Sequence, residues 1–212
     1  MSHDVIIYGA GGMAREVYEW SFNNGPISGI GNVRGYFSDS GPEPHFEAAT
    51  GLAFVDLKDA IATFPDLRVL LCVGEPAARQ EIAQRIAQQG GKLHTYIHPT
   101  AVVAKSAQIG PGCVIYPFVV VSSNTKLGQC VAINSYTGVG HDVEVGDYCV
   151  ISAQVDLTGH VKLGPGVFIG SGARIVPKKK IGAHSKIGAG VTVIKSLAAN
   201  SIIYPEANKV EQ

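Results

Sequence analysis

An aliphatic residue at every sixth position constrains the fold of this chain more than any other feature. The series runs from Ile97 to Val193 without an insertion, and all seventeen positions hold isoleucine, leucine or valine. An α-helix repeats every 3.6 residues and cannot keep a six-residue phase over so long a stretch. Short strands separated by regular turns can keep it, so the period indicates a repeat architecture.

The other positions of each six-residue unit fit a coil of stacked strands. Glycine often follows the aliphatic residue, and the fifth position is mostly small or β-branched, as at Ala101, Cys113 and Thr125. Two inward-facing positions in six residues suit a short strand and a turn. Three units would close one triangular coil, so residues one coil apart would stack at the strand spacing of about 4.8 Å. We therefore predict an all-β parallel β-helix of about five coils.

Residues 1–96 have a different pattern, typical of a small α/β domain. The strand expected at residues 4–8 leads into Gly9-Ala10-Gly11-Gly12 and then into a helix at 13–22. Further elements are expected at the apolar runs 52–55 and 68–73, at a helical pattern over 76–89 and at a strand near 93–97. This order favours a parallel sheet of the Rossmann-like type. The predicted domains are an α/β unit at 1–96 and a β-helix with a C-terminal tail at 97–212.

Charge and composition exclude several classes of protein. Equal numbers of basic and acidic residues give a formal net charge of zero, so no basic field would attract nucleic acid or an anionic membrane. The first apolar run is too short for a signal peptide or a membrane span. The four cysteines are widely spaced, without a Cys-x-x-Cys pair, so they indicate reduced packing residues. We expect a cytoplasmic protein without a metal cofactor.

The glycine turn near the N-terminus permits two interpretations. Gly9, Gly11 and Ala14 match the spacing of the dinucleotide-binding fingerprint, in which glycines let the backbone approach a phosphate. The acidic residue expected about twenty positions later is missing, because Asp39 lies thirty beyond Gly9. The turn is therefore either a nucleotide or nucleotide-sugar site, or a tight turn without a ligand.

Among the histidines, His141 has the most suggestive surroundings. It follows Val139-Gly140 and precedes Asp142, at a turn of the predicted coil. One coil further on, Gly159 would leave the space over the imidazole open, and Asp142 would stack one coil from His160. An anion beside a histidine favours the imidazolium and increases the basicity of the ring, as a general base requires. The alternatives are an ordinary polar corner for His141 and, for His160, either a partner of Asp142 or a neutral corner.

Four stretches of the sequence resemble a known family. They are Tyr8-Gly9-Ala10-Gly11-Gly12, Phe37-Ser38-Asp39, Leu70-Leu71-Cys72-Val73-Gly74 and Gly140-His141-Asp142-Val143-Glu144-Val145-Gly146-Asp147. With them, the chain is similar to the hexapeptide-repeat sugar O- and N-acetyltransferases, which include the sialic-acid O-acetyltransferases and the bacillosamine and perosamine N-acetyltransferases. The resemblance implies a left-handed β-helix and an acetyl-CoA-dependent acyltransferase that acts on a nucleotide sugar in glycan biosynthesis, such as that of lipopolysaccharide.

The resemblance also implies roles for individual residues. His141 would be the general base, and Asp142 would increase its basicity. The residues expected to hold the nucleotide sugar are Gly11, Gly12, Met13, Ser38, Asp39 and Gly74. Acetyl-CoA would lie along the β-helix between the subunits of a homotrimer. The residues expected near it are Val150, Gly159, His160, Ser171 and Ala189.

The sequence departs from the family pattern at two places. Met13 stands where family members commonly carry histidine, so a polar contact to the sugar nucleotide would be lost or replaced. The tail Tyr204-Pro205-Glu206-Ala207-Asn208-Lys209 differs in spacing from the usual Gly-x-Pro-Ala-Lys. The run Lys178-Lys179-Lys180 is either a solvated loop or a contact to a phosphate of coenzyme A.

The reaction expected is N-acetylation of a sugar such as a 4-amino-4,6-dideoxyhexose, by direct attack without an acyl-enzyme. An O-acetyltransferase acting on a sugar hydroxyl is the nearest alternative, and a non-catalytic nucleotide-binding scaffold is a remote one. A carbonic anhydrase on the same fold would need three suitably spaced histidines around zinc. The spacings from His141 to His160 and His184 do not match that requirement.

Overall fold

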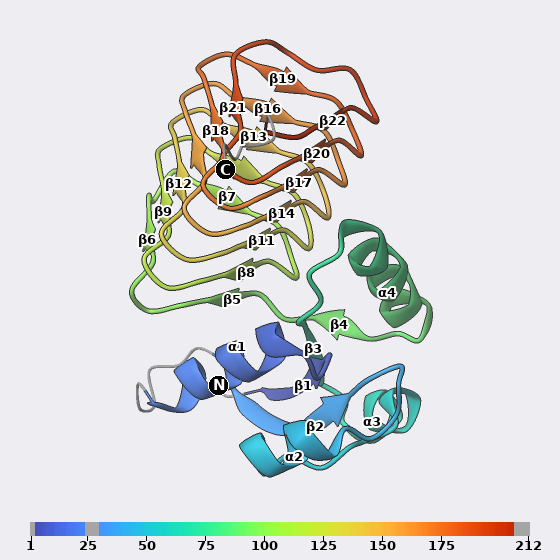
Figure 1. Ribbon diagram of the computed structural model, residues 1–212. Coiled ribbons are helices and arrows are strands. Elements are labelled where there is room, and N and C mark those ends of the chain that lie inside the picture. Colours follow the sequence, from blue (N-terminus) through green and yellow to red (C-terminus); the bar gives the residue numbers. More distant parts are fainter. Residues whose placement is uncertain (1–2, 24–29, 206–212) are drawn as a thin grey trace, which may run out of the picture.

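The computed structural model describes residues 3–23 and 30–205 and consists of an α/β unit followed by a parallel β-helix (Figure 1). The two parts have separate sheets, and the coils of the β-helix stack away from the α/β unit (Figure 1). Within the described ranges, none of the helices has the length and apolar character needed to cross a membrane. This arrangement confirms the predicted fold class.

The α/β unit contains one four-stranded parallel sheet in the order β2-β1-β3-β4. Its strands are β1 (Asp4–Tyr8), β2 (Asn32–Phe37), β3 (Arg68–Leu71) and β4 (Lys92–Leu93). Its helices are α1 (Gly12–Asn23), α2 (Pro44–Thr50), α3 (Leu57–Thr63) and α4 (Pro76–Gln88). The strand at 4–8 and the helices at 13–22 and 76–89 are thereby confirmed.

The apolar run at 52–55 forms an isolated bridge between Phe54 and Tyr36 instead of a strand. Gly51 ends α2 in the left-handed backbone region, and Asp56 already caps the N-terminus of α3. The segment between these caps pairs with β2 only through the hydrogen bonds from Tyr36 N–H to the Ala53 carbonyl and from Val55 N–H to the Tyr36 carbonyl.

The β-helix is built from two-residue strands that form three parallel sheets, which we call faces 1, 2 and 3. Face 1 contains β5 (Tyr96–Ile97), β8 (Val114–Ile115), β11 (Ala132–Ile133), β14 (Val150–Ile151), β17 (Phe168–Ile169), β20 (Lys186–Ile187) and β22 (Ile202–Ile203). Face 2 contains β6 (Val102–Val103), β9 (Val120–Val121), β12 (Gly138–Val139), β15 (Asp156–Leu157), β18 (Arg174–Ile175) and β21 (Thr192–Val193). Face 3 contains β7 (Gln108–Ile109), β10 (Lys126–Leu127), β13 (Glu144–Val145), β16 (Lys162–Leu163) and β19 (Lys180–Ile181).

Sheets of seven, six and five strands make about six turns, which corrects the expected five. Strand β22 lies beyond the last repeat position, Val193, and pairs Ile202 with Lys186. This pairing is sixteen residues apart, whereas Ile133 and Ile151 keep the regular spacing of eighteen. The six-residue period therefore stops before the β-helix does.

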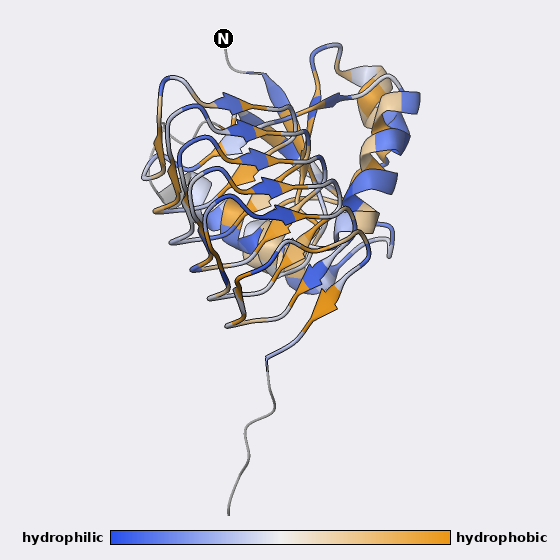
Figure 2. Ribbon diagram, turned by 90° about the horizontal axis from the view of Figure 1, so that it is seen from above, coloured by the Kyte–Doolittle hydropathy of each residue, from blue (hydrophilic) through white to orange (hydrophobic). Residues whose placement is uncertain are grey.

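The core of the β-helix contains the aliphatic repeat positions. From Ile115 to Val193, every sixth residue is at most 5% exposed. Ile97 is 37% exposed because it belongs to the first coil, which has no coil beneath it. In face 3, each strand, such as Lys162–Leu163, pairs an outward polar residue with an inward aliphatic one, and Figure 2 shows hydrophilic and hydrophobic residues alternating along the coils.

Beyond the first coil, most corners turn through a residue with positive φ. The non-glycine residues of this kind in the β-helix are Phe118, Asn124, Cys130, Tyr136, Asp142, Tyr148, Gln154, His160, Lys178, His184 and Asn200. Most follow one another at six-residue intervals, so the corner geometry has the same period as the core. Asn124, Asp142, His160 and Lys178 occupy the corner between faces 2 and 3 in successive coils. The backbone thus stacks these four residues in one column.

Arg79 of α4 joins the two parts of the molecule. Its side chain is fully buried and donates hydrogen bonds to the carbonyl oxygens of Leu71 and Val73, at 3.1 and 2.7 Å. It also donates to the carbonyl oxygens of Cys130 and Gly112 in the β-helix, at 2.7 and 3.4 Å. Burial lowers the pKa of Arg79, and these carbonyl groups replace the water that the cation loses.

Candidate active site

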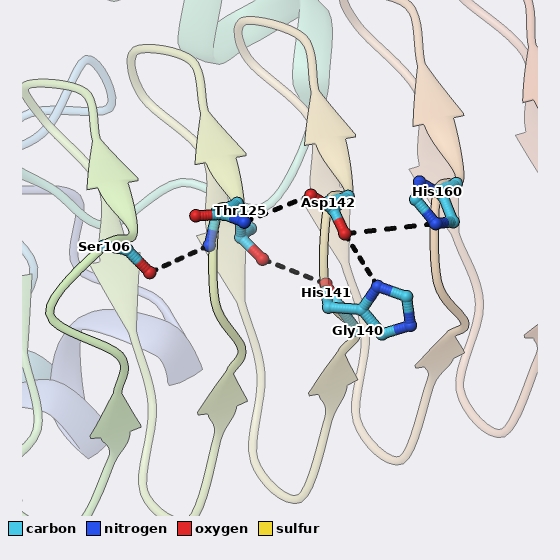
Figure 3. Close-up of polar contacts among 7 residues, drawn as sticks. Ser106, Thr125, Gly140, His141, Asp142 and His160 are labelled. Atoms are coloured by element: carbon cyan, nitrogen blue, oxygen red, sulfur yellow. Dashed lines mark hydrogen bonds and ion pairs between the residues drawn. The ribbon is translucent and has the colours of Figure 1, made fainter.

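His141 lies at the corner between faces 2 and 3, directly after β12. Its Nδ1 atom is 2.8 Å from Oδ2 of Asp142, and Figure 3 shows the two side chains turned toward each other. The backbone amide of Asp142 donates to the carbonyl oxygen of Ser123 in the preceding coil, at 3.0 Å. The coil therefore fixes the backbone on which both side chains stand.

Asp142 is held as an anion beside the imidazole. The hydrogen bond from His141 and a second from Nδ2 of Asn124, at 3.3 Å, lower the pKa of the Asp142 carboxyl group. A carboxylate only accepts hydrogen bonds, so Nδ1 of a neutral His141 carries the proton. The free lone pair of the imidazole is then on Nε2.

Gly159 lies next to this lone pair, one coil beyond His141. A Cβ atom on Gly159 would be 2.6 Å from Nε2 and 2.7 Å from Cε1 of His141. No side chain other than that of glycine fits this approach without displacing the ring. Gly159 therefore puts no side chain over the imidazole, and the ring packs against its backbone.

His160 shares the carboxylate of Asp142. Its Nε2 atom is 3.9 Å from Oδ2 of Asp142, and its ring meets that of His141 edge to face at 5.0 Å between centroids. The first distance is longer than that of a hydrogen bond. Of the two alternatives for His160, the structure supports a partner of Asp142 over an isolated corner.

The glycine turn lies at the carboxyl-terminal edge of the sheet β2-β1-β3, where ligands of open α/β sheets bind. A cavity of about 290 Å³ separates this turn from face 1 of the β-helix. Gly12, Met13 and Gly74 line it from the α/β unit, together with Glu16. The β-helix contributes Tyr116, Ala132, Ile133, Asn134, Val150, Ile151, Ser152 and Phe168. Among these residues, sequence reasoning identified only Gly12, Met13, Gly74 and Val150.

Ser38 and Asp39 follow β2 at the same edge of the sheet, outside the lining of this cavity. Oδ2 of Asp39 accepts hydrogen bonds from the Tyr8 hydroxyl and from Arg85, at 2.7 and 2.8 Å. Partial burial raises the pKa of Asp39. Gly11 is exposed at the start of the turn, with open space around its Cα.

The residues predicted near acetyl-CoA lie at two different corners of the β-helix and in face 1. Ser171 and Ala189 follow β17 and β20 at the corner between faces 1 and 2. Gly159 and His160 lie at the corner between faces 2 and 3 with His141, and Val150 lies in face 1. One chain does not bring these residues into one concave surface. The predicted tail residues Glu206-Ala207-Asn208-Lys209 lie outside the described part of the chain.

Comparison with known proteins places this geometry in a family. The model for the bacterial transferase hexapeptide (six repeats) matches residues 160–195. PerB from Caulobacter crescentus, solved with CoA and GDP-perosamine, is 27% identical and superposes over 94% of this chain and 92% of its own, with a TM-score of 0.83. The acetyltransferase domain of PglB from Neisseria gonorrhoeae, solved with acetyl coenzyme A, is 26% identical over 94% of both chains, with a TM-score of 0.80.

The chain carries the bacterial transferase hexapeptide repeat and shares the fold of hexapeptide-repeat acetyltransferases. A curated relative, UDP-N-acetylbacillosamine N-acetyltransferase from Bacillus subtilis (strain 168), is 43% identical over 51 residues. That match spans 24% of this chain and 24% of the relative. WeeI from Acinetobacter baumannii, at 23% identity and a TM-score of 0.83, shares the fold.

The four cysteines of this chain are buried free thiols. Burial raises the pKa of Cys72, Cys113 and Cys149 to about 12 and that of Cys130 to about 11. Thiols of this kind are not nucleophiles at neutral pH, because the thiolate is the reactive form. Cys113 and Cys149 instead donate to the carbonyl oxygens of Gly128 and Gly164.

Proposed function

We propose that this protein transfers the acetyl group of acetyl-CoA to the amino group of a nucleotide-linked sugar of the 4-amino-4,6-dideoxyhexose class. The observation that carries the proposal is the orientation of His141. Asp142 occupies its Nδ1 at 2.8 Å, Nε2 lies against Gly159, which has no side chain to cover it, and the His141 side chain is 60% exposed. A histidine held in this way can accept a proton at one defined atom.

In the reaction, the sugar amine attacks the thioester carbonyl while Nε2 of His141 takes one proton from the amine, directly or through one water. Collapse of the tetrahedral intermediate forms the amide, breaks the carbon–sulfur bond and releases the CoA thiolate. The imidazolium then returns its proton to that thiolate. A backbone N–H of the coil would stabilise the oxyanion. The buried, protonated cysteines fit direct transfer without an acyl-enzyme.

Similar proteins support the choice of substrates. PerB was solved with CoA and GDP-perosamine, and the PglB domain with acetyl coenzyme A. Two further structures of the Caulobacter crescentus enzyme carry asparagine or alanine in place of a histidine. The Bacillus subtilis relative is an N-acetyltransferase of a nucleotide-linked amino sugar by name.

We further infer that the working enzyme is a homotrimer with its active sites between subunits. His141 lies at the corner between faces 2 and 3, which is opposite face 1 in the triangular coil. The cavity at the glycine turn lies over face 1. An acceptor held at Gly12 and Met13 would therefore meet the base of a neighbouring subunit, with acetyl-CoA in the groove between them.

An exposed apolar surface on face 2 and at its corner with face 1 supports this assembly. Val102, Phe118, Val120 and Tyr136 are 62, 51, 45 and 61% exposed, and the rings of Phe118 and Tyr136 stack at 5.1 Å. A second copy of the chain would cover this apolar surface. Face 2 borders both corners that carry the expected acetyl-CoA residues.

An acceptor panel tests the proposed reaction. Acetyl-CoA is incubated with UDP-, GDP- and dTDP-linked 4-amino-4,6-dideoxyhexoses and with matched sugars that carry a hydroxyl in place of the amine. Release of the CoA thiol and mass spectrometry of the sugar report acetylation. We expect turnover with at least one amine. Turnover with hydroxyl acceptors alone would identify an O-acetyltransferase, and failure of a calorimetric titration with CoA would favour a non-catalytic scaffold.

A further inference from the structure

Three potential metal ligands converge at the corner between faces 2 and 3. His141, Asp142 and His160 each contribute one nitrogen or oxygen atom, and these three atoms lie within 4.8 Å of one another. Figure 3 shows both imidazoles directed at the Asp142 carboxylate from adjacent coils. The column of positive-φ corners fixes the backbones of Asp142 and His160.

We propose that this cluster binds a divalent transition-metal ion such as Zn²⁺ through Nδ1 of His141, Oδ2 of Asp142 and Nε2 of His160. Zinc binds imidazole nitrogen and carboxylate oxygen at about 2.0–2.2 Å, which places neighbouring ligand atoms of a tetrahedral site roughly 3.3 Å apart. The Asp142 oxygen is now 2.8 Å from the His141 nitrogen and 3.9 Å from the His160 nitrogen. One distance is shorter and the other longer than the ligand separation of a tetrahedral zinc site.

The side chains can make the remaining adjustment. Those of His141, Asp142 and His160 are 60, 38 and 49% exposed, so rotation about their side-chain bonds meets few neighbours. Asn124 donates to Oδ1 of Asp142 and thereby leaves Oδ2 for the ion, as the outer partners of metal sites commonly do. Three protein ligands at an exposed corner leave a fourth position for water.

A bound ion would switch the proposed base off, an inference that rests on the proposed function. Metal coordination at Nδ1 leaves the proton of a neutral imidazole on Nε2. Nε2 is the atom that lies against Gly159 and would otherwise accept the proton of the amine. The ion is therefore an inhibitor and takes no part in the transfer reaction.

A zinc titration of the untagged full chain tests the site. Calorimetry with ZnCl2 should give one ion per chain for the wild type, and His160→Asn should weaken binding at least tenfold. Asparagine suits the positive φ of His160 and removes its ligand atom. The matched control is His184→Asn, since His184 is also an exposed histidine at positive φ beside a glycine, Gly166.

The control should bind zinc like the wild type. Absence of zinc binding to the wild type, or equal affinity in the wild type and His160→Asn, would overturn the site. Once an acceptor is known, zinc should inhibit acetyl transfer by the wild type reversibly. The zinc concentration that halves the rate of His160→Asn should be at least ten times higher than the concentration that halves the rate of the wild type. Zinc binding without inhibition would refute the switch and leave the metal site standing. The calorimetric result stands even if none of the acceptors is acetylated, so the two proposals fail separately.

Discussion

Gly159 lies over the imidazole of His141 at a separation that only a residue without a side chain allows. A Cβ atom at this position would be 2.6 Å from Nε2, closer than non-bonded atoms approach. The same imidazole is held from the other side by Asp142 at 2.8 Å. The two neighbours together fix the orientation of the exposed His141 ring, with Nδ1 on Asp142 and Nε2 left without a side-chain partner at Gly159, and the proposed chemistry depends on this orientation.

Gly159→Ala should therefore reduce kcat by about 10- to 100-fold, because a displacement of about 1 Å at a reacting group can cost that much. The exposed His141 ring can rotate away, so the melting temperature should change little. Gly138→Ala is the matched control, since its Cβ would be 3.8 Å from the nearest atom, Oδ1 of Asp156. Steady-state kinetics of both variants check the prediction, and equal rates in the two would contradict it.

Asp142→Asn should change the pH dependence of stability. Hydrogen bonds from His141 and Asn124 lower the pKa of Asp142 in the folded protein, so its contribution to stability is present above the unfolded value of about 3.9 and is lost as the pH falls through the folded value. The wild type should melt above Asp142→Asn at pH 5–8, and the two should converge below pH 4.

Thermal unfolding from pH 8 to pH 3 measures this difference. Asp66→Asn, at a carboxylate that is 87% exposed, reports the general effect of removing one surface charge. If the melting temperature of the wild type exceeded that of Asp142→Asn by more below pH 4 than above it, the result would contradict a lowered pKa of Asp142.

Arg79→Ala should destabilise the fold by about 3–5 kcal/mol, because it leaves several buried carbonyl groups without a donor and opens a cavity between the domains. Urea unfolding gives the free energy. Lys92→Ala, which removes an exposed ion pair with Asp66 at 3.4 Å, should cost at most about 1 kcal/mol. Similar losses in the two variants would show that Arg79 does not hold the domains together.

Tyr136→Asp should disrupt the proposed homotrimer and abolish most acetyl transfer. Tyr136 is 61% exposed and stacks on Phe118 in the apolar surface of face 2, where a charge would oppose association. Aspartate also tolerates the positive φ of this residue. Light scattering after size-exclusion chromatography gives the mass, and a monomeric wild type with full activity would refute the assembly.

The β-helix could be predicted in detail because its period specifies both the core and the register. Ile133 and Ile151 pair as the eighteen-residue coil requires, and the same register placed Gly159 next to His141. Strand β22 could not be predicted, because its pairing of Ile202 with Lys186 departs from the period.

The α/β unit was less accessible to sequence reasoning. Strand β2 was missed, since its centre contains Arg34 and Gly35 and lacks a long apolar run. Arg79 is fully buried, although arginine is normally exposed. The cavity is lined by residues from both parts of the chain, such as Glu16 of α1 and Phe168 of β17. Local sequence patterns do not indicate how two such parts pack against each other. Glu16 could have been predicted as a lining residue because it lies four residues after Gly12 on the same helix, and residues at this spacing share a helix face.

The most direct test of the account is the turnover number of His141→Asn with an acceptor that the wild type acetylates. Asparagine cannot take a proton at neutral pH, and loss of a general base costs about 100- to 10,000-fold in rate. We predict a fall in kcat within this range, with an unchanged melting temperature. A variant that retains most of the wild-type kcat would contradict the role of His141 as the base.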